Sequence, residues 1–175
     1  MSVRSRVKTV AGIAALAAVI GSGAAGLVVP LVAEHEGEVL TTYIDPVGVP
    51  TVCFGDTDPG MAIPGVTYSV EECLDSLGRQ LLAHAGPVAE CTPSILRSPE
   101  MTAAAVSLAY NIGTGAYCRS TAARRFNAGD YAGGCAAFEM WVNAGGKRLR
   151  GLVKRRADER RLCEQGLPAM EAAAR

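Results

Sequence analysis

The residues from Thr9 to Ala33 form a run of 25 positions without a charged side chain, and this run constrains the chain most. A helix of about 20 apolar residues is long enough to cross a bilayer. Three basic residues precede the run and three acidic residues follow it: Arg4, Arg6 and Lys8, then Glu34, Glu36 and Glu38. Because basic residues stay on the cytoplasmic side, the pattern predicts an N-terminus in the cytoplasm and an exported body.

The same run is a weak membrane anchor by composition. Twelve of its 25 residues are Ala or Gly, none is aromatic, and Pro30 interrupts its last turn. Two ordinary interpretations are open. Small residues at Gly23, Ala24 and Ala25 fit a signal-peptidase site, which would make the run a removable signal peptide. Alternatively, the run is a permanent anchor.

A short window after the run combines two carboxylates with a hydroxyl. Glu36 lies where the apolar run gives way to polar residues, and the segment from Asp45 to Thr51 has the Pro and Gly content of a turn between short strands. Glycoside hydrolysis needs one carboxylic acid to protonate the leaving oxygen and a second carboxylate to activate water or stabilise positive charge on the sugar. Spacing alone fits solvated surface carboxylates as well.

The order of residues in this window resembles the signature of phage lysozymes of the T4 type, glycoside hydrolase family 24. The matching residues are Glu36, Gly37, Leu40, Tyr43, Asp45, Gly48, Thr51 and Gly55. Similar stretches at residues 109–115, 126–130, 141–146 and 151–156 extend the resemblance from about Glu34 to Cys163. Cys53 departs from the T4 enzyme, which has glycine there, but cysteine is common at this position in the lambdoid branch.

The resemblance implies an α+β, predominantly helical, lysozyme-like fold, with a small β-hairpin lobe, a helical lobe and an N-terminal apolar helix. It implies an endolysin that hydrolyses the β-1,4 bond between N-acetylmuramic acid and N-acetylglucosamine in peptidoglycan. Glu36 matches the general acid, Asp45 the second carboxylate, and Thr51 the residue that helps hold the attacking water. Asn111 matches a position that lines the sugar cleft, although a helix C-cap explains it equally well. No cofactor and no metal is expected.

The resemblance adds a third interpretation of the N-terminal run. Some lambdoid endolysins carry an uncleaved signal-arrest-release segment, which holds the enzyme at the inner membrane until depolarisation frees it. This interpretation, which the composition favours, makes residues 1–33 the release segment and residues 34–175 the catalytic domain. The expected partners are the Sec export machinery, the inner membrane through residues 9–33, and peptidoglycan. The enzyme is expected to be a monomer that passes from the membrane to the soluble periplasm.

Composition limits the other function classes. About 140 residues follow the leading segment, enough for one domain and too few for two. The formal net charge is zero, which argues against a nucleic-acid-binding protein. Basic residues gather in the second half, where they fit either an anionic wall polymer or ordinary ion pairs. A lytic transglycosylase and a non-catalytic peptidoglycan-binding module stay open as alternatives, whereas a holin would need more spanning segments.

The chain has six cysteines, which agrees with export to an oxidising compartment. Metal-type CxxC pairs are absent and only two histidines occur, so a zinc site is not expected. Other pairings are possible, but sequence order suggests three disulfides: Cys53 with Cys73, Cys91 with Cys118, and Cys135 with Cys163. Because the run from Thr9 to Ala33 has no cysteine, control by thiol exchange from the anchor is not expected.

Helical patterns dominate the rest of the chain. We expect four helices: one from a capping box at Ser69 that Gly86-Pro87 stops or kinks, one from Ser98-Pro99 to Gly113, one from Asp130 through Trp141, and one from Leu152 to Gln165 that Gly166 and Pro168 close. His35 is expected to be exposed, and Trp141 to lie in the core. Arg155 or Arg156 forms either an ion pair that supports the catalytic end or an ordinary surface pair.

Overall fold

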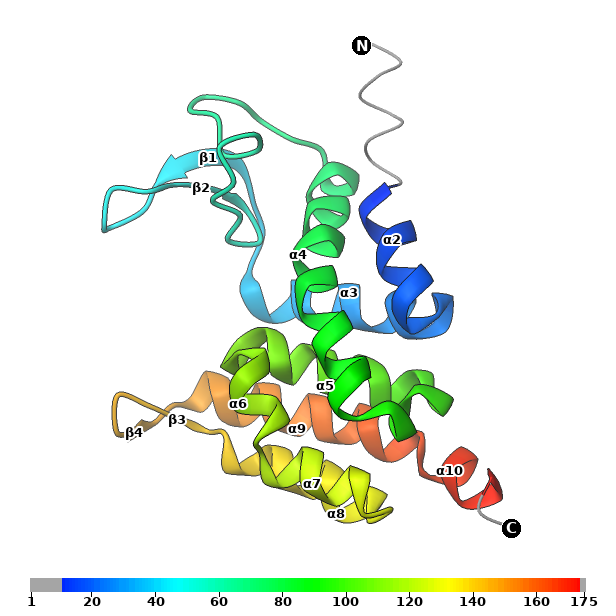
Figure 1. Ribbon diagram of the computed structural model, residues 1–175. Coiled ribbons are helices and arrows are strands. Elements are labelled where there is room, and N and C mark those ends of the chain that lie inside the picture. The colour runs from blue at the N-terminus through cyan, green and yellow to red at the C-terminus, as the bar shows by residue number, and fades with distance from the viewer. Residues whose placement is uncertain (1–10, 174–175) are drawn as a thin grey trace.

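Helix α5 (Pro99–Ile112) is the centre of the helical lobe in the computed structural model, which describes residues 11–173. Ser98 caps its N-terminus by accepting a hydrogen bond from the Met101 amide, and Gly113 ends it with φ 86°. All residues from Met101 to Ala109 are buried, and four of them are alanines, which lets neighbouring helices approach closely. Around α5 pack α3 (Ser22–Glu36), α4 (Val70–Cys91) and α9 (Arg150–Gln165) (Figure 1).

The described part of the apolar N-terminal run folds as two short helices. Helix α2 (Ala11–Ile20) is followed by α3, and Gly21 turns the chain between them with φ 83°. Helix α2 packs along α4, while α3 lies against α5 (Figure 1). Within residues 11–173 we find no helix with the length and apolar character needed to cross a membrane. The run's first residues, Thr9 and Val10, lie outside the described part of the chain.

Burial explains why this arrangement is stable. Leu16 in α2 and Val28 and Val32 in α3 are fully buried in the same core as α5. Apolar side chains that would contact lipid in a spanning helix therefore contact protein here. The expected boundary between residues 33 and 34 falls inside α3, so the N-terminal run and the body share one continuous helix.

The small lobe is an antiparallel hairpin of β1 (Val39–Ile44) and β2 (Pro50–Cys53), in which Tyr43 pairs with Thr51. A bridge between Thr41 and Thr67 attaches the segment that leads from the hairpin to α4. The mostly helical fold with a small β lobe confirms the fold class that the sequence predicts.

Helix α4 begins at the predicted capping box. The Ser69 hydroxyl accepts a hydrogen bond from the Glu72 amide, and the Glu72 carboxylate accepts one from the Ser69 amide. The helix does not stop at Pro87 but continues to Cys91. Proline removes one helical hydrogen bond, and the buried side chains on either side of it, Ala85 and Val88, hold the helix in the core.

The second half differs from the sequence expectation at two helix ends. Asp130 caps α8 (Tyr131–Ala136) as predicted, but α8 ends at Ala136 and a 3₁₀ turn, η2 (Ala137–Met140), replaces the expected helix through Trp141. Trp141 is half-buried against the core. The expected stop at Pro168 is also wrong, because α10 (Leu167–Ala173) begins there and proline is tolerated in a first helical turn. The remaining short helices are η1 (Pro93–Arg97), α6 (Thr114–Cys118) and α7 (Thr121–Asn127).

A second small hairpin, which the sequence analysis does not anticipate, precedes α9. Its strands are β3 (Asn143–Ala144) and β4 (Lys147–Arg148). Gly145 and Gly146 connect them with φ of 56° and 74°. Two consecutive residues with positive φ are what a tight hairpin of this kind requires, so the Gly-Gly pair is a turn signal.

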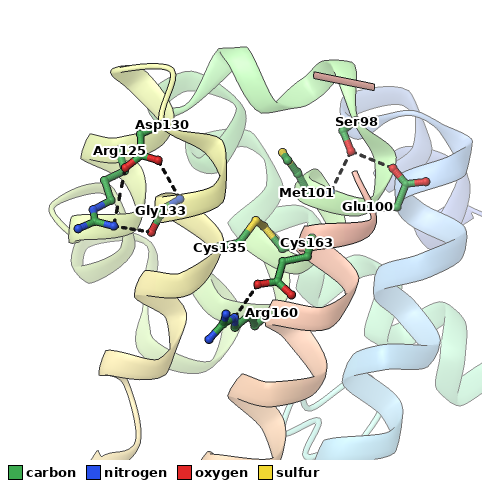
Figure 2. The surroundings of a disulfide bond; sticks show 10 residues. Ser98, Glu100, Met101, Arg125, Asp130, Gly133, Cys135, Arg160 and Cys163 are labelled. Carbon is green, nitrogen blue, oxygen red and sulfur yellow. Dashed lines mark hydrogen bonds and ion pairs between the residues drawn. A yellow bond between two sulfur atoms is a disulfide. The ribbon is translucent and has the colours of Figure 1, made fainter. Parts of the chain in front are cut away.

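Three disulfides join elements that are distant in sequence, and they are the pairs that sequence order predicts. They link Cys53 of β2 to Cys73 of α4, Cys91 of α4 to Cys118 of α6, and Cys135 of α8 to Cys163 of α9. Figure 2 shows the last one between its two helices. Its half-cystines are 28 residues apart, a loop whose closure stabilises the fold by about 3–4 kcal/mol in the chain-entropy account.

Candidate active site

Glu36 is the last residue of α3, and its carboxylate faces α9. Gly37, with φ 80°, ends the helix and turns the chain toward the β lobe. One carboxylate oxygen lies 2.6 Å from Nη1 of Arg155, and the Glu36 side chain keeps 27% of its surface exposed. The carboxyl group is therefore held by a cation on one side and accessible to solvent on the other.

Arg155 is itself fixed in a buried cluster of charged residues. Its Nε donates to Oε1 of Glu159 over 3.1 Å, and only 5% of its side chain is exposed. Arg156 Nη2 and the hydroxyl of Ser107 in α5 donate to the same oxygen over 2.9 and 2.7 Å. Arg156 and Glu159 are fully buried. Burial lowers the pKa of Arg156, while the neighbouring Glu159 carboxylate opposes that shift.

This cluster decides between the two expectations for Arg155 and Arg156. An ordinary surface pair is excluded, because both side chains are buried. Arg155 connects the buried carboxylate of Glu159 to Glu36, which supports the end of α3. A basic helix face in the sequence did not reveal the cluster, since Glu159 is one acidic residue among many charged ones in α9.

Tyr110 of α5 lies close enough to Glu36 to respond to its charge. Burial raises the pKa of Tyr110 to about 12, and the negative charge of Glu36 adds to this shift while Arg155 opposes it. The tyrosine hydroxyl donates to the side-chain oxygen of Gln80 in α4 over 3.0 Å. A neutral hydroxyl and an amide thus lie near Glu36, and neither was singled out from the sequence as a site residue.

Asp45 and Thr51 are tied to one turn of the β lobe. Oδ1 of Asp45 accepts hydrogen bonds from the amides of Val47 and Val49, over 2.9 and 2.8 Å. The Thr51 hydroxyl donates to the Val49 carbonyl over 3.1 Å, and Thr51 is 5% exposed. Val49 therefore connects the two side chains, which move as one unit, whereas Glu36 belongs to the helical lobe.

The structure also addresses two other expectations for site residues. Asn111 is exposed, and within residues 11–173 its side chain makes no hydrogen bond. The C-cap of α5 is Gly113, so the helix-cap interpretation of Asn111 is wrong. His35 is not exposed as expected, since its side chain has only 7% of its surface accessible and lies 3.6 Å from Asp158 of α9.

A cavity of about 470 Å³ lies between α4 and the segment that follows β2. Its lining residues are Asp56, Asp58, Gly60, Met61, Tyr68, Glu72, Asp75, Ser76, Arg79 and Gln80. Glu36, Asp45 and Thr51 do not line it, so we separate this cavity from the candidate catalytic residues. In the described part of the chain, no group of three His, Cys, Asp or Glu residues is arranged to hold a metal ion.

Comparison with known proteins gives consistent matches. The phage lysozyme family model matches residues 33–159. A SAR-endolysin of Enterobacteria phage P21 is 38% identical over 160 residues, which cover 87% of this chain and 94% of the relative. A SAR-endolysin of bacteriophage PS119 is 40% identical over 133 residues, covering 75% and 77%.

Two solved structures agree with the fold. A mutant of P22 lysozyme superposes with a TM-score of 0.70 at 30% identity, covering 78% of this chain and 94% of that one. The active form of the P1 phage endolysin Lyz superposes with a TM-score of 0.68 over 90% and 95% of the two chains. At 23% identity, this second likeness shows the fold alone.

The two histidines predict how stability depends on pH. Burial lowers the pKa of His35 and of His84 from the ordinary value of 6.5. The folded protein therefore binds protons less readily than the unfolded chain, so stability is full above pH 6.5 and falls as the pH drops below it. Urea unfolding at about pH 7.5 and about pH 5.5 should give a lower free energy of unfolding at the acidic pH.

Variants assign this dependence to its source. His35→Gln and His84→Gln should each reduce the stability difference between the two pH values, and the double variant should reduce it most, because the chain has no other histidine. An undiminished difference in the double variant would contradict the assignment.

Proposed function

The chain belongs to the phage lysozyme family and is a muramidase of the endolysin type, and from this premise we propose that Glu36, Asp45 and Thr51 carry out its chemistry. The observation that supports the proposal best is the contact of Glu36 with Arg155, because it fixes an accessible carboxyl group at the end of a core helix. The substrate is peptidoglycan, and the bond broken joins N-acetylmuramic acid to N-acetylglucosamine.

Glu36 serves as the general acid in this mechanism. It donates its proton to the glycosidic oxygen as the bond to the sugar breaks, and the carboxylate that remains is negatively charged. Arg155 Nη1, 2.6 Å away, stabilises that anion and fixes its orientation through a charge-assisted hydrogen bond. The buried Glu159 holds the guanidinium in place, so the orientation of Glu36 does not depend on a mobile surface side chain.

Asp45 and Thr51 act on the opposite partner, the water. Two backbone amides bind Oδ1 of Asp45 and leave Oδ2 available for the positively charged sugar or for the proton of an attacking water. Thr51 uses its hydroxyl proton on the Val49 carbonyl, so its oxygen is oriented to accept a hydrogen bond from that water. Asn111 is proposed to contact the glycan from the end of α5, where it is exposed.

Substitution of the acid tests this assignment. Glu36→Gln keeps the shape of the side chain but cannot donate a carboxyl proton, so hydrolysis should fall by at least about 100-fold. The matched control is Glu38→Gln, because Glu38 is an exposed carboxylate two residues away. The measurement is the release of reducing ends from purified peptidoglycan.

The products separate the alternatives. Equal activity of the Glu36→Gln and parent proteins would refute the role of Glu36. Anhydro-muramic ends in place of reducing ends would identify a lytic transglycosylase, and wall binding without fragments would identify a non-catalytic module.

We further propose that the chain is exported by the Sec machinery, with residues 1–33 as an uncleaved segment in the inner membrane and residues 34–175 as a catalytic domain in the periplasm. Release from the membrane then gives a soluble, monomeric enzyme. The Ala and Gly content of the segment supports this proposal, since such a helix loses little on leaving lipid. Burial of Leu16, Val28 and Val32 in the body supports it too, because the released segment has a place to fold.

The intact mass of the protein distinguishes release from cleavage. Membrane and soluble periplasmic fractions should both contain the full-length chain. A soluble form that lacks the residues up to about Ala25 would identify a cleaved signal peptide, and the absence of any soluble form would identify a permanent anchor.

A further inference from the structure

Helices α2 and α4 approach so closely that their backbones are in contact. A Cβ atom added at Gly12 would overlap the main-chain oxygen of Asp75. A Cβ atom added at Gly78 would lie 2.9 Å from the backbone nitrogen of Ile13. Both glycines are buried. The two helices therefore fit only because each has a glycine at the crossing, and Figure 1 shows them side by side.

Asp75 completes this contact with hydrogen bonds. Its Oδ1 accepts from the amides of Gly12 and Ile13, over 2.9 and 3.3 Å. These are the second and third residues of α2, whose amides have no acceptor within the helix. The Asp75 side chain is 1% exposed, and Arg79 donates to its other oxygen. An aspartate on one helix thus caps the N-terminus of another, and its charge also favours the positive end of the α2 dipole.

We propose that Asp75, Gly78 and Arg79 form a docking site on α4 for the amino end of the released N-terminal segment. The inference rests on the proposed release of residues 1–33 from the membrane. The site recognises the segment by its free amides at Gly12 and Ile13 and by the absence of a side chain at Gly12. While the segment is in lipid, Asp75 lacks these two donors, so the site is complete only after release.

The site gives the glycines of the segment different roles. Gly12 and Gly26 both weaken the membrane anchor, because each lacks a side chain. Only Gly12 meets protein backbone, since a Cβ atom at Gly26 would find nothing within 4 Å. The same contrast occurs within α4, where Gly78 faces α2 and a Cβ atom at Gly86 would meet nothing within 4 Å. Each docking glycine therefore has a matched control in its own segment.

Docking at this site bears on catalysis through chain connectivity. Helix α2 leads through Gly21 into α3, and α3 ends at Glu36. Asp75 thus holds the beginning of the folded segment, and Arg155 holds its end. The docking residues touch no candidate catalytic group, so we describe them as positioning residues.

Hydrogen exchange of the α2 amides, in full-length protein purified from the soluble fraction, tests the docking site. The readout is the exchange rate of α2 relative to that of α5, which reports on the body of the same molecules. In Gly12→Ala and Gly78→Ala, this ratio should rise by about tenfold or more, as expected for the loss of a charge-assisted hydrogen bond. In Gly26→Ala and Gly86→Ala, the ratio should match that of the parent.

Asp75 variants provide a second measurement. Asp75→Ala removes the acceptor and should raise the α2 ratio as the docking glycine variants do, whereas Arg79→Ala keeps the acceptor and should raise it less. An unchanged ratio in Gly12→Ala, Gly78→Ala and Asp75→Ala would overturn the docking site, as would an equal rise in both glycine controls. Wall digestion by the same preparations is scored separately, so an inactive protein with a protected α2 would refute the proposed chemistry and support the docking site.

Discussion

The ion pair between Arg155 and Glu36 depends on a buried carboxylate, and the candidate site depends on that ion pair. Glu159 is enclosed in the core, where Arg155, Arg156 and the Ser107 hydroxyl bind it. Loss of one partner of such a cluster leaves an uncompensated buried charge, typically at a cost of about 3–5 kcal/mol. Because α9, α5 and α3 meet at these residues, the cluster joins the stability of the helical lobe to the orientation of Glu36.

The N-terminal run is compatible with two environments for one physical reason. Its residues are apolar enough to enter a bilayer, yet many are so small that the helices they form pack closely against other helices. Gly12 against Asp75 and Gly23 against Pro99 are contacts that larger residues would not allow. The break at Gly21 lets the run fold back on the body as α2 and α3. A uniformly Leu-rich helix would bind lipid more strongly but would not fit this surface.

Local signals in the sequence predicted local structure well. The capping box at Ser69, the hairpin after Glu36 and the three disulfides follow from short patterns or from cysteine order. Features that depend on tertiary packing were not predictable in this way. The charge pattern of α9 does not show which of its arginines are buried, and the position of His35 next to Glu36 does not show that α9 covers it. Proline at positions 87 and 168 suggested helix stops, but packing and helix position overrode that preference.

The central claim is that Glu36 is positioned only when the N-terminal segment has left the membrane and packed on the body. The most direct test compares the specific activity of the full-length protein held in membrane vesicles with that of the released protein, using soluble peptidoglycan fragments that reach both. The tethered protein should be at least about 100-fold less active, because a misplacement of about 1 Å can have that effect on a catalytic group. Equal activity of the two forms would contradict the account.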